Sequence, residues 1–321
     1  MADNSRPGVV VLGAGVSGLT TALCLVDAGI AVRLVSDRPP HDTTSAVAGA
    51  IWGPYAVNDD RVIDWSMRTW ERLRQLSGRS DSGVRLLSGV EAATEEVTPP
   101  DWAHQVDGFL QVGPRGLPSG YVSGWRYRAP AVDMVTYLGF LTKCLADRGV
   151  VVEMVGRVNR LDDLLPMSSM IVNCTGLGAR ELVPDTSLHG IRGQLLVVEN
   201  PGLREFFSDY PESSTPTYIV PQGDLVVLGG TFVEHAELVD PDLHVAAEIR
   251  ARCARVEPAV ADAPLRAIRV GLRPARPRVR LEAVDLGEAV VIHNYGHGGS
   301  GITMSWGCAE DARGLVQQFL S

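Results

Sequence analysis

The sequence has a deficit of positive charge and few cysteines. Among 321 residues it holds 29 lysines and arginines against 38 aspartates and glutamates, a formal net charge of -9 at pH 7. Because negative charge repels polyanions, nucleic acid and anionic membranes are excluded as expected partners. The five cysteines are odd in number, widely spaced and set among apolar residues. They predict reduced, buried thiols of a cytoplasmic protein rather than disulfides or metal ligands.

Long hydrophobic runs are also absent. The segments without a full charge, such as residues 289–309, are rich in glycine and polar side chains, so no membrane span is expected. The first eight residues are polar and lack the apolar core of a secretory signal peptide. No internal repeat is evident. With 45% hydrophobic residues, the chain is long enough for two globular domains.

A glycine-rich turn near the N-terminus lies between two predicted strands. Residues 9–12 are an apolar, β-branched run, residues 19–28 have helical spacing, and residues 31–36 form the next predicted strand. In this setting a GxGxxG motif predicts dinucleotide binding, with the pyrophosphate at the helix N-terminus and Asp37 on the ribose hydroxyls. The motif consists of Gly13, Ala14, Gly15, Val16, Ser17 and Gly18.

The rest of the chain shows two patterns. Residues 133–148 have helical spacing, and residues 150–155 and 170–174 have the character of buried strands, which extends the N-terminal α/β layer. Antiparallel strands are predicted instead at 194–199, 217–220 and 225–232, with a hairpin turn at Gln222-Gly223-Asp224. We therefore predict an α/β fold in which a discontinuous, Rossmann-like dinucleotide-binding domain is interleaved with an antiparallel-sheet substrate-binding domain. The expected bounds are 1–52, 131–190 and 268–321 for the first domain and 53–130 and 191–267 for the second.

A second glycine-rich loop lies near the C-terminus. The β-branched run at 290–292 leads into a loop with four glycines among residues 296–301, and a helical pattern follows. Glycines permit close approach of the backbone to a ligand, and the next helix, expected to begin near Gly301, presents free N–H groups at its N-terminus. This arrangement suits a group that gains negative charge during a reaction.

Four segments, in this order, resemble the D-amino-acid oxidase family. They are the GxGxxG motif, residues 42–55, Asn173-Cys174-Thr175-Gly176 and the C-terminal glycine loop. The resemblance implies FAD as the cofactor, since a nicotinamide dehydrogenase would explain only the first segment. Beyond the GxGxxG motif, the implied FAD contacts are Asp37, Arg38, Thr43, Thr44, Ser45, Gly49, Ala50, Ile51, Val158, Thr175, Gly298, Gly299, Ser300, Gly301, Ile302 and Thr303.

The resemblance also implies a substrate site. Arg273 stands where the family places the arginine that binds the substrate α-carboxylate, and only a guanidinium grips a carboxylate through two parallel hydrogen bonds. Tyr218 matches the tyrosine that supports the same carboxylate, and the Gly299 carbonyl would accept a hydrogen bond from the substrate amine. Phe232 is expected to form an apolar wall. The other arginines nearby are interpreted as a solvated charge run: Arg276, Arg278 and Arg280.

The implied reaction is FAD-dependent oxidative deamination of a D-amino acid by hydride transfer from Cα to flavin. The products are a 2-oxo acid, ammonia and hydrogen peroxide, so a D-amino acid and molecular oxygen are the expected partners. Homodimer formation is left open. No metal is expected, because His293 and His297 lack a neighbouring cluster of cysteines or acids, which favours packing or hydrogen-bonding roles. A D-aspartate oxidase or a glycine oxidase-like flavoenzyme remains the alternative.

The expected substrates are neutral, apolar D-amino acids. Segment 205–249, which should form the pocket wall and lid, contains no lysine or arginine, whereas a second substrate carboxylate would need a cation of its own on leaving water. Glu205, Asp209, Glu212 and Glu234 would add repulsion. Three positions have smaller side chains than in mammalian family members, which predicts a roomier pocket or a less closed lid: Gly53, Ser214 and Ser300.

Overall fold

One mixed sheet organises the molecule. The computed structural model describes residues 8–55, 57–210 and 215–320, and within these ranges thirteen strands follow the order β4-β5-β3-β9-β10-β11-β8-β12-β13-β7-β1-β2-β6. The strands are β1 (Val9–Leu12), β2 (Val32–Ser36), β3 (Val84–Ala93), β4 (Leu110–Val112), β5 (Ser123–Val132), β6 (Val152–Met154), β7 (Met170–Asn173), β8 (His189–Glu199), β9 (Phe206–Asp209), β10 (Tyr218–Gln222), β11 (Leu225–Gly229), β12 (Leu265–Asp285) and β13 (Val290–His297). The α-helices are α1 (Val16–Asp27), α2 (Val62–Leu76), α3 (Met134–Ala146), α4 (Ala179–Leu182), α5 (Leu243–Val256) and α6 (Ser305–Leu320).

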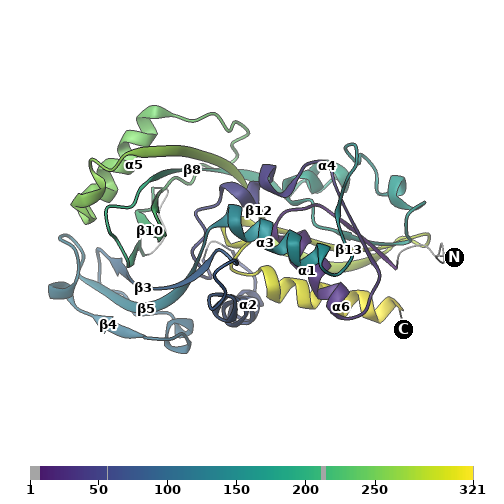
Figure 1. Ribbon diagram of the computed structural model, residues 1–321, viewed down its shortest axis with the longest axis horizontal. Coiled ribbons are helices and arrows are strands. Elements are labelled where there is room, and N and C mark those ends of the chain that lie inside the picture. The colour runs from purple at the N-terminus through teal and green to yellow at the C-terminus, as the bar shows by residue number, and fades with distance from the viewer. Residues whose placement is uncertain (1–7, 56, 211–214, 321) are drawn as a thin grey trace.

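Strands β13, β7, β1, β2 and β6 form a parallel half. Val9 and Val11 of β1 face the large core that contains α1, α3 and α6, whereas Val10 and Leu12 face a smaller cluster that includes Leu182 of α4. Helices therefore cover both faces, as Figure 1 shows around the label β13. Burial on both sides explains the unbroken β-branched runs of these strands.

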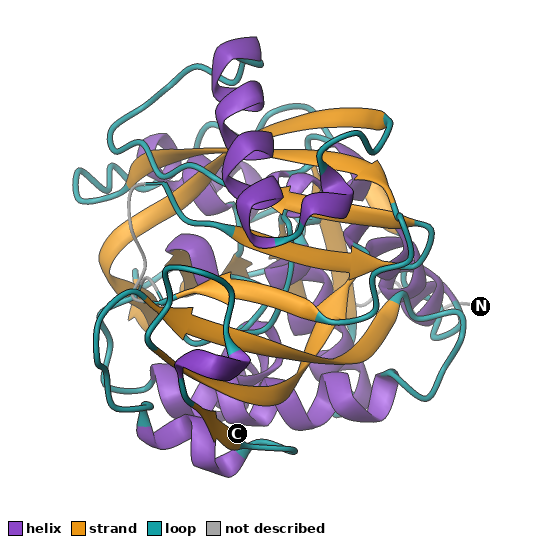
Figure 2. Ribbon diagram, turned by 90° about the vertical axis from the view of Figure 1, so that its left-hand side faces the viewer, coloured by secondary structure: helices purple, strands orange, loops and turns teal. Residues whose placement is uncertain are grey.

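The other half is largely antiparallel, although β3 and β9 pair in parallel. Along β8, Leu196 and Val198 pack with Ile249 of α5, and the alternate residues Leu195 and Val197 face the opposite side together with Tyr218. In Figure 2, which faces this end of the molecule, these strands run across the view as a curved sheet, and a helix crosses its upper side. The period-2 alternation thus gives one face to α5 and the other to the centre of the molecule.

Strand β12 joins the two halves. It pairs with β8 through residues 265–275 and with β13 through residues 275–285. The predicted fold class is confirmed. The division into two domains stays a prediction, and its expected boundary at 267/268 falls within the first residues of β12.

Several predicted bounds differ from the observed ones. The first helix begins at Val16 rather than residue 19, β8 begins five residues earlier than expected, and β11 ends at Gly229, where the chain leaves the sheet. The hairpin at Gln222-Gly223-Asp224 is confirmed by the pairing of β10 with β11. All five cysteines are free, but Cys144 is only half-buried, so the prediction of uniformly buried thiols is wrong there.

Candidate functional site

Two glycines of the GxGxxG turn leave no room for a side chain. Gly13 has a φ of 109°, and a Cβ there would lie 2.6 Å from the Cys174 carbonyl oxygen. A Cβ at Gly18 would lie 1.8 Å from the Gly13 carbonyl oxygen. These contacts bring strand β1, helix α1 and the end of β7 together at the carboxyl edge of the parallel strands, where doubly wound folds bind nucleotides.

The segment at residues 43–45 contacts the start of α1. The Val16 N–H donates to Ser45 Oγ at 3.0 Å, and a Cβ on Gly15 would lie 3.1 Å from that oxygen and 3.9 Å from Thr43 Oγ1. The first turn of α1 carries no acidic side chain. Its partial positive charge is therefore available to an anionic group such as a pyrophosphate.

The C-terminal glycine loop closes on the same edge. Gly298–Ser300 form a short 3-10 helix, Ser300 Oγ donates to the Tyr55 carbonyl, and the Gly53 N–H donates to Thr303 Oγ1 at 3.2 Å. Ile302 and Thr303 are buried. The expected helix start near Gly301 is wrong, because residues 301–304 form turns and the regular helix α6 begins at Ser305.

Polar side chains link this loop to the GxGxxG turn. Ser17 Oγ donates to the Asn294 carbonyl at 3.1 Å, and Asn173 Oδ1 accepts from the Thr175 N–H at 3.1 Å. His293 lies 3.4 Å from Asn173 Nδ2, and His297 lies 3.0 Å from Asn294 Oδ1. Burial lowers the pKa of each imidazole to about 4, so both are neutral hydrogen-bonding groups at pH 7, as predicted.

The remaining predicted cofactor contacts lie around this edge. Asp37 and Arg38 follow β2, are exposed and form an ion pair at 3.2 Å. Val158 packs against the cluster that contains Leu12. Ala50 has a φ of 42°, and its carbonyl accepts from the Val132 N–H. The helix N-terminus without acidic side chains, the closely packed glycines of the turn and the hydroxyls around it fit a dinucleotide, although the individual FAD contacts stay predictions.

Arg273 approaches the glycine loop from β12. Two residues further along, Ala275 pairs with His297, the residue that precedes Gly298. The Arg273 guanidinium donates to the Thr231 carbonyl at 3.1 Å and lies 5.0 Å from the Phe232 ring centroid. It has no carboxylate partner in the described part of the chain. A cation in this position can receive a carboxylate.

Tyr218 lies against the same corner. A Cβ on Gly230 would lie 2.7 Å from the Tyr218 hydroxyl, and one on Gly49 would lie 3.3 Å from its ring. Gly230 directly precedes Thr231, which Arg273 contacts. Residues 229–232 thus bring Tyr218 and Arg273 together, and Gly49 connects the tyrosine with the predicted cofactor segment.

The solvated charge run is a wrong interpretation for two of its three arginines. Arg276 is half-buried and donates to Asp185 Oδ2 at 2.9 Å, and Arg280 donates to the Tyr295 hydroxyl at 2.8 Å. Arg278 alone is exposed, in an ion pair with Asp60 at 2.7 Å. The buried Asp185 explains the difference because a buried carboxylate requires charged or polar partners.

Two features of the site were not predicted from the sequence. A Cβ on Gly193 would lie 2.4 Å from the Arg273 guanidinium, so this glycine leaves the room that the arginine occupies. Buried Glu91 accepts from the hydroxyls of Tyr55 at 2.8 Å and Tyr127 at 3.1 Å, which places a carboxylate behind the tyrosine that Ser300 contacts. Neither lies in a recognisable motif. Ser214 and Glu212 lie outside the described residues.

The family model described as FAD dependent oxidoreductase (DAO) matches residues 8–313. The chain belongs to this family. The predicted resemblance and the FAD cofactor are therefore confirmed, and the protein is a flavin-dependent oxidoreductase. None of the helices in the described ranges has the length and apolar character needed to cross a membrane.

Curated relatives match almost the whole chain. A D-amino-acid oxidase of Rubrobacter xylanophilus is 44% identical over 315 residues, which covers 97% of this chain and 96% of that protein. A D-amino-acid oxidase of Streptomyces coelicolor is 41% identical, with 98% of each chain covered. The D-aspartate oxidase of Homo sapiens is 35% identical, with 98% of this chain and 96% of that protein covered.

Solved structures share the fold. Glycine oxidase from Geobacillus kaustophilus has a TM-score of 0.80 at 16% identity, with 98% of this chain and 95% of that chain covered. L-proline dehydrogenase from P. horikoshii has a TM-score of 0.79 at 13% identity, with 98% and 94% covered. At these identities the likeness shows the architecture alone.

Proposed function

We propose that this protein is a D-amino-acid oxidase that converts neutral, apolar D-amino acids into 2-oxo acids, ammonia and hydrogen peroxide. The observation that carries the proposal is the position of Arg273. Its guanidinium lies against Thr231 and Phe232, without a carboxylate partner in the described ranges, on the strand that pairs with the glycine loop. The D-amino-acid oxidases among its relatives support the same reading.

Three groups of the chain would orient the substrate. Arg273 holds the α-carboxylate through two hydrogen bonds, the Tyr218 hydroxyl adds a third, and the Gly299 carbonyl accepts from the amine. These contacts leave one enantiomer with its Cα hydrogen toward the cofactor. Bound FAD would supply the acceptor for that hydrogen as a hydride, with oxygen as the final electron acceptor. Orientation of this kind can contribute about 7–11 kcal/mol to lowering a barrier.

The preference for neutral side chains rests on different residues from those that the sequence suggested. Glu205 pairs with Arg126, Asp209 accepts from Tyr121, and Glu234 bonds His189, so these carboxylates are already engaged. The support comes instead from the apolar surroundings of Tyr218, which include Ile51, Leu195 and Val220.

D-aspartate oxidation is the second candidate, because the human D-aspartate oxidase is also a relative. The test is peroxide release by purified holoenzyme with D- and L-leucine, D-valine, D-methionine, D-lysine, D-aspartate and D-glutamate in one buffer. We expect turnover of the neutral D-forms and none of L-leucine. A kcat/KM for D-aspartate or D-glutamate above every neutral substrate would move the protein to the acidic-substrate branch.

A cytoplasmic location and a homodimer belong to the same proposal. The free state of all five cysteines supports a reducing compartment. Exposed Leu238, Val239 and Leu243 lie close together in sequence and offer apolar surface for a second copy. Light scattering of the purified protein tests the assembly, and a monomeric mass at micromolar concentration would remove the dimer.

A further inference from the structure

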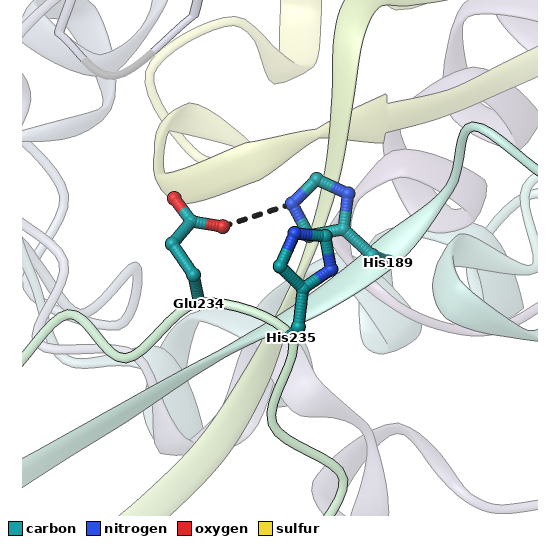
Figure 3. A group of neighbouring side chains, drawn as sticks. All are labelled: His189, Glu234 and His235. Atoms are coloured by element: carbon teal, nitrogen blue, oxygen red, sulfur yellow. Dashed lines mark hydrogen bonds and ion pairs between the residues drawn. The ribbon is translucent and has the colours of Figure 1, made fainter.

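Three metal-ligating side chains converge beside the segment that contacts Arg273. His189 begins β8, and Glu234 and His235 lie in the segment after β11 (Figure 3). His189 Nε2 lies 3.0 Å from Glu234 Oε2, and the rings of His189 and His235 stack at 4.4 Å. One potential ligand atom from each residue lies within 4.8 Å of the other two. Sequence spacing hides the group because its two parts are far apart along the chain.

We propose that His189, Glu234 and His235 bind one divalent transition-metal ion of the zinc class. Two imidazoles and one carboxylate form a ligand set that holds zinc and leaves a fourth position for water. With bonds of about 2.0–2.1 Å, tetrahedral ligand atoms lie about 3.3 Å apart. At 3.0 Å the His189–Glu234 pair is already close to this spacing, and the His235 side chain is exposed.

The backbone around the three ligands is already held in register. The Arg192 N–H donates to the Val233 carbonyl at 2.8 Å, the Val233 N–H donates back at 3.0 Å, and the Ala236 N–H donates to the Gly190 carbonyl at 3.1 Å. Only side chains need to move on binding, which limits the entropic cost of forming the site.

Nearby cations are occupied by other partners. Arg180 pairs with Glu237 at 3.3 Å, and Arg192 donates to the Asp240 carbonyl at 2.6 Å and to Gln194. Glu237 offsets the charge of Arg180, the neutral acceptors of Arg192 keep its guanidinium directed away as a hydrogen-bond donor, and Glu234 supplies one negative charge directly to an incoming cation.

The site connects to the substrate anchor through a short stretch of chain. Glu234 follows Phe232 by two residues, and Phe232 and Thr231 are the groups that contact Arg273. A bound ion links this stretch to β8 and restricts the motion of Thr231 and Phe232 beside Arg273. We call this restriction the brace. The ion takes no part in the proposed oxidase reaction, and its binding is measured without substrate.

The first test is titration of untagged, metal-free holoenzyme with zinc chloride by calorimetry. We expect one ion per chain, with affinity about 10–100-fold or more weaker in His235→Ala and in Glu234→Gln. His244→Ala is the matched control, because His244 and Glu248 form an exposed pair at 3.3 Å with no third ligand among the described residues, and it should bind like the wild type. Absence of stoichiometric binding by the wild type, or undiminished binding by both ligand variants, would overturn the site.

The second test measures the brace by amide hydrogen exchange. Zinc should slow exchange at Val233 and Ala236 in the wild type and leave it unchanged in His235→Ala, since only the intact site links both segments. Equal exchange with and without zinc in the wild type, under conditions where calorimetry shows saturation, would contradict the brace.

Discussion

Arg273 and Arg276 lie three residues apart on β12, yet their surroundings differ completely. Arg273 contacts a main-chain carbonyl and an aromatic ring, and no carboxylate among the described residues neutralises it. Arg276 is bound to Asp185, which also accepts from Tyr295 at 2.8 Å and Ser187 at 2.6 Å. Arg273 lies in the stretch of β12 that pairs regularly with β8, whereas Arg276 lies where the pairing with β13 shifts register. The comparison teaches that the partner already present, rather than the residue type, separates a ligand anchor from a structural ion pair.

The largest expected effect comes from removing the anchor. Arg273→Ala should lose about 3–5 kcal/mol of transition-state binding, a decrease of about 100- to 4000-fold in kcat/KM for D-leucine, while it retains the flavin absorbance. Arg278→Ala is the control, since its ion pair is exposed. Turnover of Arg273→Ala close to the wild-type rate would remove it as the anchor.

Acid should destabilise the fold through the buried histidines near the glycine loop. Burial lowers the pKa of His297 from 6.5 to about 4, so the stabilisation is fully present above pH 6.5 and is lost as the pH falls toward 4. The loss is on the order of 3 kcal/mol, and His297→Gln should flatten this part of the profile. Urea unfolding between pH 7 and 4 measures it. A free energy of unfolding that stays constant over this range would contradict the neutral, buried state.

The next largest effect is expected from a substitution that crowds Arg273 without removing it. A Cβ in Gly193→Ala would lie 2.4 Å from the Arg273 guanidinium, and a flexible side-chain end can move away without unfolding the protein. A displacement of about 1 Å from a productive geometry costs about 100-fold in rate. Gly139→Ala, a helical position with open space, is the matched control. Equal kcat/KM in the two variants would separate Gly193 from the anchor.

Arg276, in contrast to Arg273, should affect the stability of the fold and not the turnover. Burial alone would raise the pKa of Asp185, but bonds from Ser187, Tyr295 and Arg276 lower it to about 2. Arg276→Ala should therefore reduce the free energy of unfolding by about 2 kcal/mol, less than a fully buried pair because Arg276 is partly exposed. We expect unchanged kcat/KM once the folded fraction is taken into account. A large loss of turnover with unchanged stability would reverse the comparison.

The smallest effect is expected from Tyr218→Phe. The change deletes one hydrogen bond to a charged group, about 1.5 kcal/mol or roughly tenfold in kcat/KM. The ring stays, so its packing near Gly49 and Gly230 should be kept. Thermal unfolding checks the packing, and steady-state kinetics check the hydrogen bond. A loss of kcat/KM as large as that of Arg273→Ala would give the tyrosine a greater role than carboxylate support.

The sequence was informative where structure is determined locally. The GxGxxG turn, the hairpin at residues 222–224 and the β-branched strands of the parallel half depend on neighbouring residues, and all three were predicted. The family resemblance supplied Arg273 and Tyr218, because these residues stand in ordered motifs. Helix ends were less accurate, as at Ser305, because turns and helices share the same local spacing.

Features that depend on pairing between distant strands were not predictable. Gly193 accommodates Arg273 only because β8 pairs with β12, and Asp185 reaches Arg276 across 91 residues of sequence. The group of His189, Glu234 and His235 arises in the same way, from the segment after β11 lying beside β8. Contacts between segments far apart in the sequence determine each case, and neither composition nor periodicity reports them.

Anaerobic mixing of D-leucine with the holoenzyme, followed by flavin absorbance in the wild type, Arg273→Ala and Arg276→Ala, tests the central claim most directly. The reductive step is observed alone, without oxygen or product release. We predict rapid bleaching by D-leucine and none by L-leucine in the wild type, bleaching at least about 100-fold slower at subsaturating D-leucine in Arg273→Ala, and a near wild-type rate in Arg276→Ala. Bleaching by L-leucine, or equal slowing in both arginine variants, would contradict the account.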